Sequence, residues 1–96
     1  MSPLKRKKLS KIRSELDKLD NSFIKLIKKR TNLVKKVLAL KDKKNQIIDQ
    51  KRIKKILNNI KKKSLRNNID PKITNRIWKN MIWAYIDFEK RNFKKK

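Results

Sequence analysis

The sequence predicts an all-α fold with three helices per chain, one long and two shorter. Glycine is absent from the 96 residues, and both prolines stand where a helix could begin. Strands joined by tight turns usually need glycine, so these two features disfavour a sheet. The apolar residues also recur at the spacing of amphipathic helices.

We expect the first helix to run from Pro3 or Leu9 to Lys41. At 1.5 Å per residue it would span on the order of 50 Å, which is too long for two shorter helices of the same chain to cover. A chain this short also buries a core only marginally. We therefore expect a homodimer in which a second copy helps to bury the apolar stripe of this helix, formed by Leu9, Ile12, Leu16, Leu19, Phe23, Leu26, Leu33, Val34, Val37 and Leu40.

The next segment, residues 42–46, is polar and lacks apolar periodicity, which predicts a loop. Asp49 is suited to cap a second helix, because its side chain can accept from free backbone amides. This helix should end between Lys61 and Asn68, where the sequence becomes polar. Its apolar stripe consists of Ile53, Ile56, Leu57 and Ile60.

Asp70 and Pro71 mark the start of a third helix, since aspartate caps the first turn and proline fits within it. We expect this helix to end near Phe93, with Glu89 at the edge of a broad apolar face. Residues 1–8 are expected to be a frayed basic lead-in, residues 9–93 the helical domain and residues 94–96 a basic tail. The apolar face consists of Ile73, Ile77, Trp78, Met81, Ile82, Tyr85 and Phe88.

Composition excludes several classes of chemistry. The chain has neither cysteine nor histidine, so disulfides, the usual zinc ligands and thiol or imidazole catalysis are excluded. We expect no metal and no cofactor. No apolar run approaches the roughly 20 residues of a membrane span, so we expect a cytoplasmic protein with no membrane partner.

The formal charge is +24, from 32 Lys and Arg against 8 Asp and Glu. Such a charge is typical of nucleic-acid-binding proteins. Here, however, the excess is mostly lysine and covers nearly every solvated position, where a recognition surface would concentrate it in one patch. Nucleic-acid binding is therefore kept only as a remote alternative.

Two cations interrupt the apolar stripe of the first helix. On a helical wheel Arg30 and Lys41 differ by about 20° and lie near the middle of the stripe, whereas Arg13 lies about 100° from Arg30. A buried charge is costly unless it is paired, so an anion is expected beside Arg30 and Lys41. Alternatively, the two side chains reach solvent or pair with Glu15 or Asp20.

These residues carry a resemblance to a known family. Residues 9–20, LSKIRSELDKLD, resemble the opening motif of the all-helical chorismate mutases, and Lys29-Arg30 with Val34, Val37 and Lys41 resembles its continuation. Asp49 and Arg52 resemble the start of the family's second helix, and Ile69-Asp70-Pro71 that of its third. The resemblance covers residues 9–90.

The resemblance implies an interlocked, domain-exchanged homodimer that rearranges chorismate, a dicarboxylate, to prephenate for phenylalanine and tyrosine synthesis. It implies that each pocket takes Arg13 from one chain and Arg30, Lys41 and Arg52 from the other. Lys41 and Glu89 would donate hydrogen bonds to the ether oxygen as negative charge develops on it. The implied substrate-binding residues are Arg13, Arg30, Lys41, Asp49, Arg52, Ile53, Tyr85 and Glu89.

Three positions depart from the usual mutase pattern. Ile53 stands where a glutamate is common, Tyr85 where a serine is common, and Glu89 where a glutamine is usual. The first two changes also resemble isochorismate-pyruvate lyases, which form salicylate and pyruvate, so that activity is the alternative. Ile53 could equally be a plain core residue of the second helix, and Glu89 could pair with Lys41 at the pocket rim.

Overall fold

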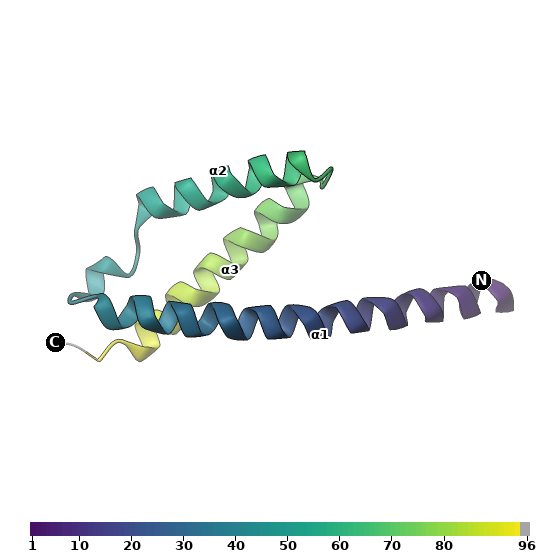
Figure 1. Cartoon of the computed structure of the whole chain (residues 1–96), viewed down its shortest axis with the longest axis horizontal. Coiled ribbons are helices and arrows are strands. Elements are labelled where there is room, and N and C mark those ends of the chain that lie inside the picture. The colour runs from purple at the N-terminus through teal and green to yellow at the C-terminus, as the bar shows by residue number, and fades with distance from the viewer. Residues whose placement is uncertain (95–96) are drawn as a thin grey trace. The chain divides into compact units, whose positions relative to one another are not determined.

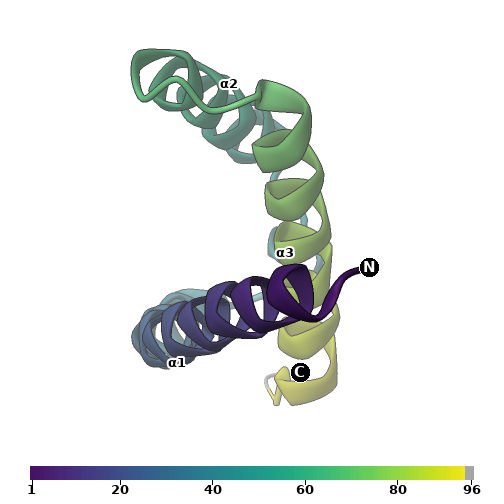
Figure 2. The same cartoon turned by 90° about the vertical axis from the view of Figure 1, so that its right-hand side faces the viewer.

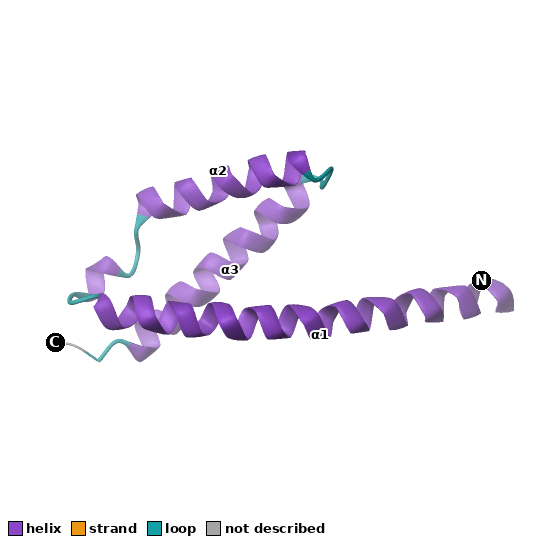
Figure 3. Ribbon diagram, viewed as in Figure 1, coloured by secondary structure: helices purple, strands orange, loops and turns teal. Residues whose placement is uncertain are grey.

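The computed structural model describes residues 1–94, and Figures 1 and 3 show helices joined by short loops in this part of the chain. The helices are α1 (Pro3–Leu40), the short 3-10 helix η1 (Lys44–Gln46), α2 (Gln50–Arg66) and α3 (Pro71–Asn92). The all-α prediction of one long and two shorter helices is confirmed. Of the predicted basic tail, residues 95 and 96 lie outside the described residues.

Helix α1 begins at the earlier of the two predicted starts. Ser2 caps it: its Oγ accepts the backbone N–H of Lys5 at 3.2 Å, and its carbonyl accepts the N–H of Arg6 at 2.9 Å. Pro3 occupies the first turn, where its missing N–H costs nothing. The prediction of a frayed lead-in is therefore wrong for residues 3–8, which are helical.

The chain divides into two compact units, Met1–Leu33 and Val34–Lys96, and α1 contributes to both. Met1–Leu33 contains a single helix, which cannot bury its own apolar stripe. Leu16 is 53% exposed and Phe23 is 60% exposed. Along Pro3–Leu40, all of it described, no residue is buried. Most of the stripe that the sequence predicts to be buried is therefore exposed in the single chain, although Leu9 and Val34 are half-buried.

In the second unit, α2 and α3 pack against each other, and Figures 1 and 2 show them diverging from the turn that joins them. Asp49 and Asp70 cap the two helices as predicted, accepting the N–H groups of Arg52 at 3.0 Å and Lys72 at 2.9 Å. Both starts are thus set by residues next to them in sequence.

Helix α2 ends in a Schellman motif built without glycine. Asn68 adopts the left-handed conformation, with φ 56°. Its N–H donates to the Leu65 carbonyl at 3.3 Å, and the N–H of Ile69 donates to the Ser64 carbonyl at 2.9 Å. Asparagine tolerates this conformation better than other non-glycine residues do, so it replaces the usual glycine.

The core of the second unit lies where the segment after α1 meets α3. Its buried members are Ile47, Ile82 and Ile86, and Leu38 and Ile53 are among the half-buried residues that pack against them. Between α2 and α3, the hydroxyl groups of Ser64 and Thr74 share a hydrogen bond of 2.6 Å. No helix in the described part of the chain is long and apolar enough to cross a membrane.

Candidate active site

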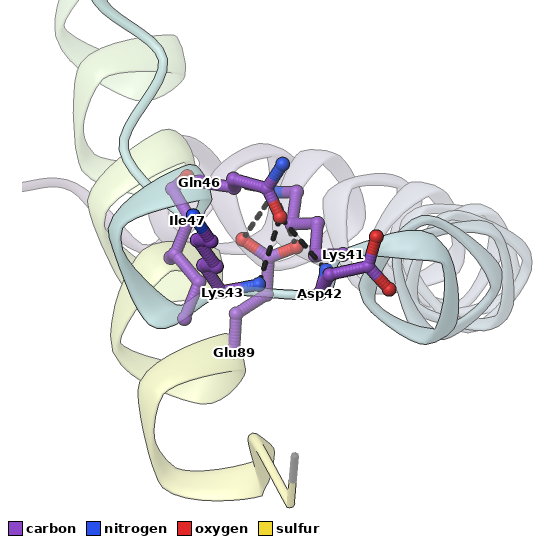
Figure 4. Close-up of polar contacts among 6 residues, drawn as sticks. All are labelled: Lys41, Asp42, Lys43, Gln46, Ile47 and Glu89. Atoms are coloured by element: carbon purple, nitrogen blue, oxygen red, sulfur yellow. Dashed lines mark hydrogen bonds and ion pairs between the residues drawn. The ribbon is translucent and has the colours of Figure 1, made fainter. Parts of the chain in front are cut away.

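Lys41 and Glu89 form an ion pair at one end of the core (Figure 4). The Lys41 Nζ lies 3.1 Å from Oε1 and 3.4 Å from Oε2 of Glu89, and 3.5 Å from the Ile47 carbonyl oxygen. The side chains of Lys41 and Glu89 are 19% and 7% exposed. Residues 48 positions apart in sequence therefore meet in one partly shielded polar site.

Because both side chains are shielded from water, the charges of Lys41 and Glu89 stabilise each other. Glu89 follows the buried Ile82 and Ile86 on the same face of α3, where an unpaired carboxylate would be costly. The Lys41 ammonium compensates it with charge-assisted hydrogen bonds. The structure shows the alternative in which Glu89 pairs with Lys41, with the Glu89 side chain buried. An anionic ligand beside Arg30 and Lys41 stays a prediction.

The pair offers a defined donor to a ligand. An ammonium has three protons, and three protein oxygens lie within 3.5 Å of the Lys41 Nζ. The two longer contacts, to Glu89 Oε2 and the Ile47 carbonyl, are the weakest. An incoming oxygen acceptor could replace one of them without breaking the 3.1 Å contact.

Asp49 and Arg52 lie at the start of α2. Asp49 and Lys41 both line an open depression of about 470 Å³. The backbone of Arg52 is fixed by the Asp49 cap, and its side chain is exposed. The structure therefore brings Lys41, Glu89 and Asp49 to one end of the second unit, with Arg52 one turn along α2.

Ile53 and Tyr85 also belong to this unit. Ile53 is half-buried and packs against the core cluster, which agrees with its interpretation as a core residue of α2. Tyr85 is half-buried and lies one turn before Glu89 on α3. Contact of either side chain with a substrate stays a prediction.

Arg13 and Arg30 belong to the other unit, Met1–Leu33. Arg30 is half-buried, and Arg13 is exposed. Arg13 lines a shallow depression on α1 together with Ser10 and Asp17. Their 17-residue separation along α1 corresponds to about 100° of rotation, so the two side chains leave the helix in different directions.

Two residues next to this site are not predicted from the sequence. Gln46 lies in the predicted loop, and its side chain accepts two backbone hydrogen bonds there. Ile47 is a core residue whose carbonyl faces Lys41. The sequence pattern that could have indicated them is Gln46 followed by Ile47 and Ile48, shortly after the end of a predicted helix and without glycine.

Comparison with known proteins shows which family the chain belongs to. The sequence matches the family model for chorismate mutase type II over residues 12–90. It is 36% identical over 76 residues to a chorismate mutase from Methanocaldococcus jannaschii, in an alignment covering 78% of this chain and 77% of that protein. No solved structure matches it. The resemblance seen in residues 9–90 is thereby confirmed. Because the family match covers most of the chain, the chain belongs to the chorismate mutase type II family.

Proposed function

We propose that this protein is a chorismate mutase, which rearranges chorismate to prephenate for phenylalanine and tyrosine synthesis. The observation that carries the proposal is the shielded Lys41–Glu89 pair in a chain of this family. The pair supplies hydrogen-bonding groups at a partly shielded site, where such groups act more strongly than in bulk water.

The reaction is an intramolecular rearrangement. The ether C–O bond of chorismate breaks while a new C–C bond forms, so atoms and electrons balance without a nucleophile, base or metal. Negative charge develops on the ether oxygen in the transition state. The Lys41 ammonium donates a hydrogen bond to this oxygen, and Glu89 donates a second one when it is protonated.

Three arginines bind the two substrate carboxylates in this proposal. A guanidinium can hold a carboxylate through two parallel hydrogen bonds, which also fixes the folded conformer needed for reaction. Arg30, Arg52 and Arg13 serve this role, and Asp49, Ile53 and Tyr85 line the rest of the pocket.

The active form is an interlocked homodimer in which Arg13 enters the pocket from the second chain. The exposed apolar stripe of α1 supports this, because a stripe more than half exposed at Leu16 and Phe23 needs a covering surface. The different direction of Arg13 from Arg30 on α1 is a second support.

The competing activity is cleavage of isochorismate to salicylate and pyruvate. Ile53 and Tyr85 are the two residues that resemble the enzymes with this activity. Assaying the purified protein with chorismate and with isochorismate, at equal concentrations, separates the two reactions. We expect prephenate formation with the higher kcat/KM. Faster release of pyruvate from isochorismate, or no prephenate from chorismate, would overturn the proposal.

A further inference from the structure

We propose that Gln46 is a positioning residue for Lys41: its side-chain amide fastens the turn after α1 and so fixes where the Lys41 ammonium lies. This inference rests on the proposed mutase function. Gln46 lines the same open depression as Lys41 and Asp49, but the role proposed for it here is not a contact with the substrate. It acts through the backbone on either side of the catalytic lysine.

The first support is a pair of hydrogen bonds to one oxygen (Figure 4). The Gln46 Oε1 accepts the backbone N–H of Asp42 at 2.7 Å and that of Lys43 at 2.9 Å. These amides have left the helix, because α1 ends at Leu40 and the N–H of Lys41 already takes the Leu38 carbonyl at 3.1 Å. The Gln46 side chain thus bonds the two amides that directly follow Lys41.

The second support is that the backbone of Gln46 closes the same turn. Its N–H donates to the Lys43 carbonyl at 3.0 Å, so both backbone groups of Lys43 are bonded to Gln46. The next N–H, of Ile47, donates to the Lys44 carbonyl at 3.2 Å. The turn is therefore fastened through both the side chain and the main chain of one residue.

The turn also places Ile47 beside Lys41. The Ile47 side chain is buried in the core, and its carbonyl oxygen accepts from the Lys41 Nζ at 3.5 Å. Lys41 is consequently held at its backbone by the amides that Gln46 binds, and at its ammonium by Ile47 and Glu89. Loosening the turn would release the backbone of Lys41 and weaken the contact of its ammonium with the Ile47 carbonyl.

The charges around the turn explain why an amide serves here. Lys43 and Lys44 follow Lys41 closely, with Asp42 as the single acidic residue among them, and the repulsion between the lysines favours opening of the turn. A carboxylate at position 46 could accept the same two N–H groups, but it would add negative charge near a site for a dianionic substrate. A neutral amide provides the acceptor without that repulsion.

The test compares three variants for kcat and KM with chorismate, and for hydrogen exchange of the Asp42 and Lys43 amides. Gln46→Met keeps the side-chain length but leaves only a weak sulfur acceptor. Gln46→Glu keeps the acceptor and adds a charge. Asn45→Met changes the exposed neighbour in the same 3-10 helix and is the matched control.

We expect Gln46→Met to lose amide protection and to lower kcat on the order of tenfold, which is less than the roughly 100-fold cost of a 1 Å misplacement. Gln46→Glu should retain protection and kcat but raise KM. Asn45→Met should match the wild type in all three measurements. A merely structural role for Gln46 would not divide kcat from KM in this way.

Two results would overturn the inference. Retained protection in Gln46→Met would mean that these contacts do not hold the turn, and lost protection with wild-type kcat would mean that the turn does not position Lys41. A wild-type protein inactive on chorismate would instead overturn the proposed function and with it the catalytic role of Gln46. The exchange measurements distinguish these failures, because they do not depend on activity.

Discussion

At the residue scale, the central feature is the Lys41–Glu89 ion pair, in which each partner lowers the free-energy cost of burying the other's charge. Lys41 and Glu89 are paired in the structure, with Glu89 as the acceptor. In the proposed reaction both side chains donate to one ether oxygen. The proposed reaction therefore requires Lys41 to give up at least one of its protein acceptors to the ether oxygen.

Replacing Lys41 should separate catalysis from stability. Lys41→Met leaves a buried carboxylate without its cation, so we expect unfolding free energy to fall by about 1–3 kcal/mol. The loss of a transition-state donor should lower kcat on the order of 100-fold or more. Urea unfolding and steady-state kinetics measure the two effects.

The double variant Lys41→Met with Glu89→Met is the control for that experiment. It removes both charges while roughly conserving volume, so stability should return toward the wild-type value although activity should not. A double variant as unstable as Lys41→Met alone would show that the lost stability does not come from the unpaired carboxylate.

The donor role of Glu89 gives a prediction for an amide variant. A carboxylic acid donates to the ether oxygen only in its protonated form, whereas the amide of Glu89→Gln always carries donor protons, so kcat/KM should be retained or raised in Glu89→Gln. Steady-state kinetics of both proteins with chorismate test this. A large loss of kcat/KM in Glu89→Gln would mean that Glu89 serves as the charged partner of Lys41 and not as a donor.

At the element scale, local signals predict the helix ends well. Asp49, Asp70 and Pro71 act within a few residues of themselves, so the starts of α2 and α3 follow from the sequence. The start of α1 stays open between Pro3 and Leu9 until the Ser2 cap is seen. The role of Gln46 could not be predicted, because its two hydrogen bonds exist only once the turn has folded.

The end of α2 offers a stability test. Asn68 has φ 56°, a conformation that costs non-glycine residues about 1–2 kcal/mol and β-branched residues most. We expect Asn68→Val to lower the unfolding free energy by about that amount. Asn68→Gly should equal or exceed the wild type in stability. Thermal unfolding of the three proteins checks this, and equal Tm values for Val and Gly variants would contradict it.

At the scale of the whole molecule, periodicity predicts which face of α1 is apolar, but it cannot say what covers that face. The single chain leaves the stripe exposed, as at Leu16 and Phe23. The sequence likewise cannot show which site residues come from a second chain. Lys41 and Glu89 meet within one chain, whereas the expected contribution of Arg13 depends on a second copy and stays a prediction.

The charge of the whole chain predicts a salt effect on catalysis. A net charge of +24 should attract a dianionic substrate over distances that salt screens. Raising ionic strength from about 0.01 M to about 0.1 M shortens the Debye length from about 30 Å to about 10 Å. We expect kcat/KM to fall by roughly tenfold while kcat is unchanged. A kcat/KM independent of salt would exclude such steering.

The most direct test of the account is complementation between two inactive variants. Arg13→Ala and Lys41→Met, each as a homodimer, should convert chorismate very slowly, because each lacks one component of every pocket. Co-expression with different affinity tags, followed by purification on both, isolates the mixed dimer. In that dimer one pocket combines an intact Arg13 with an intact Lys41 from the other chain.

We predict that the purified mixed dimer regains about half of the wild-type kcat per dimer, because one of its two symmetry-related pockets is intact. If each pocket were built from a single chain, every pocket in the mixed dimer would lack one residue. A mixed dimer as inactive as its parents would therefore contradict the shared mutase site.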